Sequence, residues 1–125
     1  MPTITTKRVY EPIDKSKGVR VLVDRVWPRG ISKEKLQAEH WLKDVAPSSE
    51  LRKWFNHDPK RWEEFKHRYW EELQNKPELI SFLLALTEEQ GLVLLYSARD
   101  TEHNQAVALQ EYLLTQQQHP TTSIT

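Results

Sequence analysis

Three arginines at the ends of apolar runs could bind an anion. Arg25 and Arg29 lie in the segment DRVWPRG (residues 24–30), directly after the apolar run VRVLV. Arg99 follows a second apolar run, LVLLYS (residues 92–97). A guanidinium group presents a planar set of donors that matches phosphate or carboxylate. These arginines are therefore candidate contacts for a small phosphorylated or carboxylated ligand, although Arg25 could instead pair with a neighbouring aspartate.

Acid–base and aromatic residues accompany these arginines. Asp100 and His103 are candidate acid–base groups, because histidine titrates near neutral pH and a carboxylate neighbour can raise its pKa. Trp27 and Tyr96 could stack on the organic part of a ligand. Simpler structural roles stay open: Asp100 could cap the last helix, and Trp27 could cover the core.

Ser97 and Asn104 complete the predicted ligand-binding set. Both lie close to the start of the last predicted helix, where free backbone N–H groups favour an anion. A catalytic pair of Ser97 and His103 is conceivable, but these residues are six positions apart across a strand-to-helix turn. The residues that would perform chemistry remain Asp100 and His103, and the sequence does not decide whether the protein is an enzyme.

A second group of residues suggests a different function. The segment LRKWFNHDPKRW (residues 51–62) interleaves basic and aromatic side chains, a pattern that can bind nucleic acid. Two amphipathic helices that bury their aromatic residues would give the same pattern. His57 and Asp58 could ligate a metal, although Asp58 is also a good helix cap. The alternative to a small-ligand site is thus a non-catalytic module that binds nucleic acid or a partner protein.

Composition narrows these possibilities. The 125 residues include 18 Lys and Arg and 18 Asp and Glu, and this balance argues against nucleic acid as the partner. There is no cysteine, which excludes disulfides and thiol chemistry. Only three glycines are present, and no glycine-rich phosphate loop occurs. No apolar run is long enough to span a membrane, so we expect a cytoplasmic protein. The sequence assigns neither a cofactor nor an oligomeric state.

The pattern of apolar residues predicts an α/β fold. Strands are predicted over residues 4–10, 19–26 and 92–97, and helices over residues 32–42, 48–55, 58–74, 77–91 and 101–114. The helical excursion between the last two strands favours a right-handed crossover and parallel pairing. We expect a small, mostly parallel sheet covered by helices in a single domain over residues 1–114, and three strands leave room for a fourth that the pattern hides. A flexible tail is expected over residues 115–125.

Parallel pairing would bring the candidate residues together. The carboxyl ends of parallel strands lie at one edge of the sheet, where ligands of open α/β sheets bind. One end would deliver Arg25, Trp27 and Arg29, and the other would deliver the residues from Tyr96 to Asn104. This convergence, rather than any single residue, predicts the site.

Three segments of the sequence resemble the YeaO-like proteins, which are bacterial proteins within the group called domain of unknown function 488. The segments are RVLVDRVWPRG, WLKDVAPSSELRKWFNHDPKRWEEFKHRYWEEL and LLYSARDTEHNQAVALQEYL, and the resemblance covers about residues 7–114. It implies a compact, cytoplasmic, single-domain bacterial protein, but no established activity. Longer relatives carry cysteines in the last segment; this chain has Ser97 at one such position and His103 near another, so their thiol chemistry would be absent.

Overall fold

The computed structural model describes residues 3–14 and 17–118, and these form one compact α/β domain. Its sheet has four parallel strands in the order β1-β4-β2-β3. The strands are β1 (Ile4–Arg8), β2 (Val19–Leu22), β3 (His40–Trp41) and β4 (Leu92–Tyr96). The predicted parallel pairing is confirmed, since Val19 pairs with Leu92 and Leu22 with Leu95. The sheet contains one more strand than the three predicted from the sequence.

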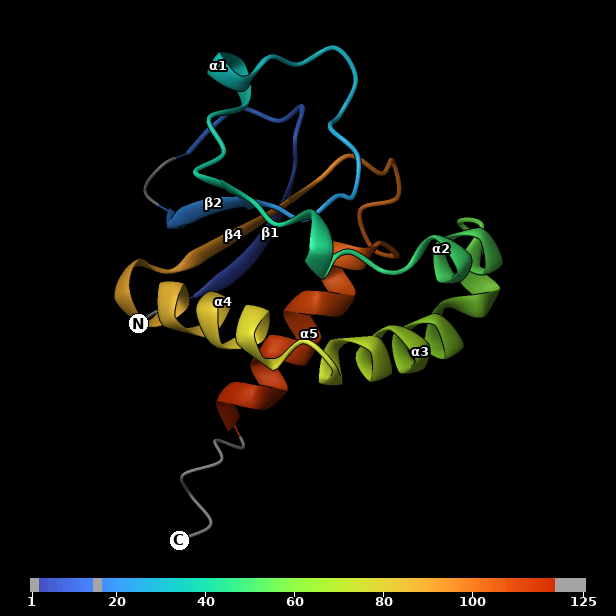
Figure 1. Cartoon of the computed structure of the whole chain (residues 1–125). Coiled ribbons are helices and arrows are strands. Elements are labelled where there is room, and N and C mark those ends of the chain that lie inside the picture. The colour runs from blue at the N-terminus through green and yellow to red at the C-terminus, as the bar shows by residue number, and fades with distance from the viewer. Residues whose placement is uncertain (1–2, 15–16, 119–125) are drawn as a thin grey trace, which may run out of the picture.

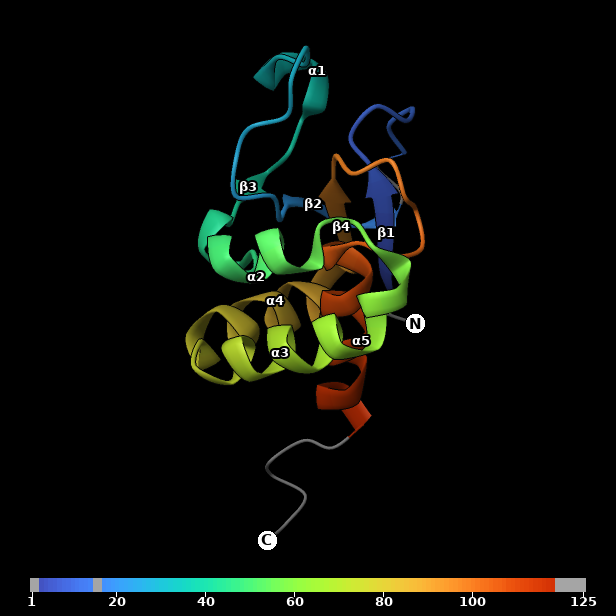
Figure 2. The same cartoon turned by 90° about the vertical axis from the view of Figure 1, so that its right-hand side faces the viewer.

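Helices cover one face of the sheet and build the main core there. These helices are α3 (Trp62–Gln74), α4 (Pro77–Gln90) and α5 (Gln105–Gln118), with α2 (Ser49–Phe55) packed on α3. Figures 1 and 2 show α4 and α5 beneath the strands, with α3 beside them. Every residue of β2 and β4 is buried, which explains why their sequences are nearly continuous apolar runs.

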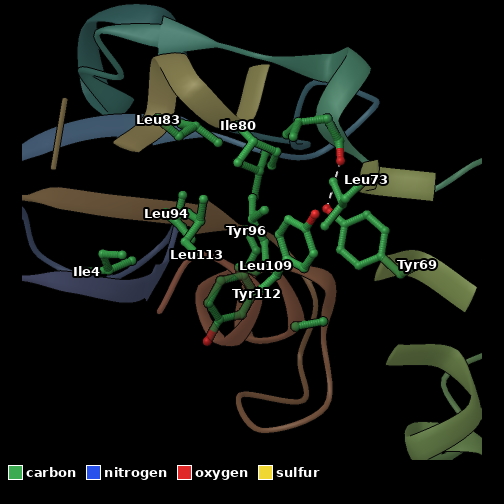
Figure 3. Close-up of a cluster of buried hydrophobic side chains, with 14 of the residues drawn as sticks. Ile4, Tyr69, Leu73, Ile80, Leu83, Leu94, Tyr96, Leu109, Tyr112 and Leu113 are labelled. Atoms are coloured by element: carbon green, nitrogen blue, oxygen red, sulfur yellow. Dashed lines mark hydrogen bonds between the residues drawn. The ribbon is translucent and has the colours of Figure 1, made fainter. Parts of the chain in front are cut away.

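Side chains alternate between the two faces of the central strands. Leu92, Leu94 and Tyr96 point toward the helices, and Figure 3 shows Leu94 and Tyr96 among residues of α4 and α5. Val93 and Leu95 point to the opposite face, where a smaller core lies under α1 (Lys33–Leu36) and the loops around it. The sheet therefore has a large core on one side and a small one on the other.

Most predicted helix ends are confirmed by their capping residues. The Ser48 hydroxyl accepts a hydrogen bond from the Leu51 N–H and begins α2. Asp58 caps a short 3₁₀ helix, Pro59–Arg61, which leads directly into α3. Helix α4 begins at Pro77 and ends at Gly91, whose φ of 85° lies in the left-handed region that favours glycine.

The helix predicted over residues 32–42 is wrong beyond its first turn. Helix α1 stops at Leu36 because Gln37 takes a left-handed conformation, with φ of 53°. Arg20 stabilises this stop by donating from Nη2 to the Leu36 carbonyl at 2.7 Å and from Nε to the Gln37 carbonyl at 3.2 Å. The chain then extends to form β3, and a 3₁₀ helix (Lys43–Val45) follows.

The last helix is displaced relative to its prediction. It begins at Gln105, four residues later than expected, because residues 101–104 form a bent turn. It also continues to Gln118, so residues 115–118 are helical rather than part of a tail; residues 119–125 lie outside the described residues. Strands β1 and β2 end earlier than predicted, which leaves residues 23–31 to form the loop after β2. No helix among residues 3–14 and 17–118 is both long and apolar enough to cross a membrane.

Candidate functional site

A cleft of ≈ 1050 Å³ lies at the carboxyl ends of the three strands β1, β4 and β2. Its lining comes from the segments that follow these strands, from α2 and from the start of α5. The structure thus brings together the two segments that the sequence placed at one sheet edge. The predicted residues in the lining are Arg25, Trp27, Arg29, Ser97, Arg99, Asp100, His103 and Asn104.

Asp24 connects the two segments. Its Oδ2 accepts hydrogen bonds from the Ser97 Oγ at 2.6 Å and from the Ser97 N–H at 3.1 Å. Its Oδ1 accepts from the Gln105 side-chain amide. Burial raises the pKa of Asp24, and the hydrogen bonds from Ser97 and Gln105 act in the opposite direction. The sequence indicated Asp24 only as a possible partner for Arg25 and gave no signal for Gln105.

Arg25 does not pair with an aspartate. Its guanidinium donates to the backbone carbonyls of Ala46 and Pro47 over 3.3–3.4 Å. The neighbouring carbonyls are bound as well: Val45 accepts from the Tyr69 hydroxyl at 2.7 Å, and Asp44 accepts from Lys76 Nζ at 2.6 Å. Arg25 therefore holds the backbone that forms one wall of the cleft, which is a structural task.

Trp27 lines the cleft and also covers the small core. Its Nε1 donates to the Ile31 carbonyl at 2.7 Å, and its ring meets Trp41 edge to face at 5.4 Å between centroids. The Tyr10 hydroxyl donates to the Arg29 carbonyl at 2.7 Å, which ties the loop after β1 to the loop after β2. These contacts fix the course of both loops around the cleft.

Asp100 and His103, the two candidate acid–base residues, lie in contact. Asp100 Oδ2 and His103 Nδ1 are 2.9 Å apart, and Asp100 Oδ1 accepts from the backbone N–H groups of Glu102 and His103. The bond from the Glu102 N–H does most to lower the pKa of Asp100; the His103 side chain and N–H lower it further, and desolvation acts in the opposite direction. The His103 ring packs edge to face on Trp62 at 5.3 Å. Asp100 therefore caps the turn before α5, and His103 stays partly exposed.

Tyr96 and Asn104 have different surroundings from those the sequence suggested. Tyr96 lies in the main core and is not part of the cleft lining. Asn104 is 2% exposed; its Oδ1 accepts from the Val107 N–H at 3.0 Å, and its side-chain amide donates to the Asp100 carbonyl at 2.8 Å. Asn104 is thus the N-cap of α5, the role that the sequence had offered to Asp100.

Two sets of side chains in the cleft contrast in their bonding. We call Asp24, Ser97, Asn104 and Gln105 the polar cluster, because each makes side-chain hydrogen bonds within the protein. We call Arg29, Arg52, Lys53 and Arg99 the cationic rim, because all four are exposed and none makes a side-chain hydrogen bond or salt bridge within residues 3–14 and 17–118.

Arg8, Arg52 and Lys53 were not predicted as site residues. Arg8 Nε donates to the carbonyls of Ser97 and Ala98 at 3.2 and 3.0 Å, so it supports the segment after β4. Arg52 and Lys53 come from α2, whose pattern of basic and aromatic residues was the available signal. That pattern did not indicate which of the helix's charges would face a cleft.

Among the described residues, His57 and Asp58 are not joined by a third side chain that could ligate a metal. Asp58 Oδ1 accepts from the Lys60 N–H at 3.0 Å, as expected for a helix cap, whereas His57 is exposed at the cleft. His103 contacts Asp100 instead of joining them. Within the described part of the chain, no group of three or more His, Cys, Asp or Glu residues is arranged to hold a metal ion.

Comparison with known proteins identifies relatives along most of the chain. A family model described as the inactive DUF488-N3 subclade matches residues 3–123. The uncharacterized protein YeaO of Escherichia coli strain K12 is 42% identical over 110 residues, which cover 88% of this chain and 96% of that protein. Uncharacterized proteins of Mycobacterium bovis and Mycobacterium tuberculosis are each 43% identical over 110 residues, covering 88% of this chain and 92% of theirs. No solved structure matches the chain at a significant level.

Proposed function

The chain belongs to the DUF488 family as a YeaO-like protein, and we propose that its cleft binds a small phosphorylated or carboxylated anion. The observation that carries this proposal is the charge of the lining. Six lining residues are Arg or Lys and two are Asp, whereas the whole chain has equal numbers of basic and acidic residues. A concave surface lined by one sign of charge concentrates ions of the opposite sign.

The cationic rim supplies the contacts for this anion. Arg8 and Arg25 already donate to backbone carbonyls, so their guanidinium groups have a structural role. Arg29, Arg52 and Arg99 are exposed, and no hydrogen bond within the described residues engages their guanidinium groups. These are the groups that a ligand can engage without breaking an existing bond. Arginine is also the side chain best suited to bidentate contact with phosphate or carboxylate.

The proposed activity is binding without turnover. The matching family model is described as an inactive subclade, and this chain has no cysteine to act as a nucleophile. The Ser97 hydroxyl is 2.6 Å from a carboxylate that also accepts the Ser97 N–H, a geometry that fixes the strand end. The Asp100–His103 pair remains the candidate acid–base group if turnover is detected.

The packing of the aromatic residues gives no support to a nucleic-acid interface on α2 and α3. Arg61 and Arg68 lie over the Trp54 ring, with 5.3 and 4.3 Å between guanidinium carbon and ring centroid. Phe55 and Trp62 are buried in the main core. Base stacking needs exposed aromatic faces, which these side chains do not offer.

The test is isothermal titration of the purified protein with inorganic phosphate, glycerol 3-phosphate and malate. We expect at least one anion to bind, with an affinity that falls as salt rises, because exposed charges make the contact. Arg29→Gln should weaken that binding about tenfold while leaving the circular dichroism spectrum unchanged. Arg68→Gln, on α3 outside the cleft, is the matched control and should bind like the wild type. Absence of binding by all three anions would refute the proposal.

A further inference from the structure

Asp24 is a buried carboxylate within a cleft whose charged lining residues are mostly cationic. We infer that it selects a hydroxylated anion, a ligand that carries a hydroxyl donor beside its phosphate or carboxylate. This inference rests on the proposed function and specifies the class of ligand for the same site.

The Asp24 carboxylate has room for one more donor. An ionised carboxylate offers about four acceptor positions on its two oxygens. The Ser97 hydroxyl and N–H occupy two positions on Oδ2, and the Gln105 amide occupies one on Oδ1. Asp24 is 7% exposed and belongs to the lining of the cleft. A ligand hydroxyl could therefore donate to Oδ1 without displacing any donor among the described residues.

Arg52 is the member of the cationic rim whose charge acts on Asp24. Burial raises the pKa of Asp24, and the positive charge of Arg52 acts against that rise, which places Arg52 within electrostatic range of the carboxylate. Arg52 and Asp24 also line the same cleft. A ligand of a few carbon atoms could place its anionic group at Arg52 and a hydroxyl at Asp24.

Asp24 also disfavours ligands that lack the hydroxyl. An anion without a donor would leave the carboxylate partly desolvated and facing an apolar group, and a second anionic group at that position would be repelled. Sites built to accept a ligand hydroxyl reject analogues without it for this reason. The cationic rim attracts many anions, and Asp24 is the residue that can distinguish among them.

The first test needs no variant. Calorimetric titration of the wild-type chain compares glycerol 3-phosphate with propyl phosphate, and malate with succinate. We expect the hydroxylated member of at least one pair to bind about tenfold more tightly, the size of a hydrogen bond to a charged group. Equal affinities within both pairs would overturn the inference while leaving the proposed function intact. If none of the four anions binds, this inference fails, and the proposed function fails with it when inorganic phosphate does not bind either.

The second test assigns the preference to Asp24. Asp24→Asn keeps the shape of the side chain but removes its charge, and it should reduce the preference to less than threefold with phosphate binding retained. Asp44→Asn is the matched control, because it makes the same change at an exposed carboxylate outside the cleft lining; it should keep the preference. A preference that persists in a folded Asp24→Asn protein would show that another residue selects the ligand. If this variant does not fold, the wild-type comparison alone decides.

Discussion

The polar cluster and the cationic rim line the same cleft but are built in opposite ways. In the polar cluster, Asp24 bonds with Ser97 and Gln105, and Asn104 caps α5. In the cationic rim, Arg29, Arg52, Lys53 and Arg99 extend into solvent. Buried polar groups must be paired to avoid a desolvation cost, whereas exposed charges keep their hydration without a protein partner. The first set therefore contributes to stability, and the second is available to a ligand.

A similar contrast separates the arginines from one another. Arg20 is 3% exposed, and its guanidinium closes the end of α1, although its Nη1 has no hydrogen-bond partner within the described residues. Arg25 holds the backbone at Ala46 and Pro47. The guanidinium groups of Arg29 and Arg99 make no hydrogen bond to the backbone or to another side chain within the described residues. An arginine at the end of a strand can thus be a structural clamp or a ligand contact, and its bonding partners distinguish the two.

The largest effect should follow the loss of the Asp24 carboxylate. Asp24→Ala would leave the Ser97 N–H, the Ser97 hydroxyl and the Gln105 amide without their acceptor, and we expect the free energy of unfolding to fall by about 3 kcal/mol. Urea denaturation followed by tryptophan fluorescence measures this change. Ser97→Ala, which removes one donor, should cost about 1 kcal/mol. A loss below about 0.5 kcal/mol for Asp24→Ala would mean that water replaces the carboxylate without penalty.

A smaller effect should appear in the pH dependence of stability. Burial raises the folded-state pKa of Asp24 above its ordinary value of 3.8, so the native state binds more protons than the unfolded state between that value and the raised one. Stability contributed by this group is present at low pH and decreases as pH rises through that interval. Relative to Asp24→Asn, which does not titrate, the wild type should lose stability as pH rises from about 4.

The check on this prediction is a series of urea denaturations of both proteins across that pH range. The contribution of Asp100 to the free energy of unfolding has the opposite pH dependence. Its pKa is lowered, so this contribution is lost as pH falls below 3.8. The difference between wild type and Asp24→Asn cancels the contribution of Asp100, which both proteins share. A difference that is constant with pH, or that grows in favour of the wild type as pH rises, would contradict the prediction.

The smallest effect on stability should follow changes in the cationic rim. Arg52→Gln removes an exposed charge without a hydrogen-bonded partner among the described residues, so the free energy of unfolding should change by less than about 0.5 kcal/mol. Urea denaturation of this variant beside Asp24→Ala gives the comparison directly. A loss near that of Asp24→Ala would show that Arg52 is a structural residue and that the distinction between rim and cluster does not hold.

Part of the candidate site was predictable from the sequence. The central strands were predictable from their apolar runs and their parallel pairing from the helical crossover between them, and this pairing brings the segments around Arg29 and Arg99 to one edge. Tyr96 was misplaced for a physical reason. Alternation puts it on the same face as Leu94, but both faces of this strand are apolar, so the pattern cannot reveal which face meets the main core.

Other features depended on contacts that no local pattern contains. The two-residue strand β3 is too short to show a period of two, and its sequence continues a helical pattern that Gln37 interrupts. Arg52 and Lys53 resemble any exposed face of an amphipathic helix. They belong to the cleft only because α2 packs on α3 next to the carboxyl ends of the strands.

The sequence by itself therefore determined the class of fold, the parallel sheet and the edge at which polar residues gather. It did so because apolar periodicity and helix capping are local, and because parallel strands have a fixed direction. Only the tertiary structure decided which of those polar residues are structural and which are free. That division depends on hydrogen bonds between residues far apart in the chain, such as Asp24 with Ser97, and on the burial that makes those bonds necessary.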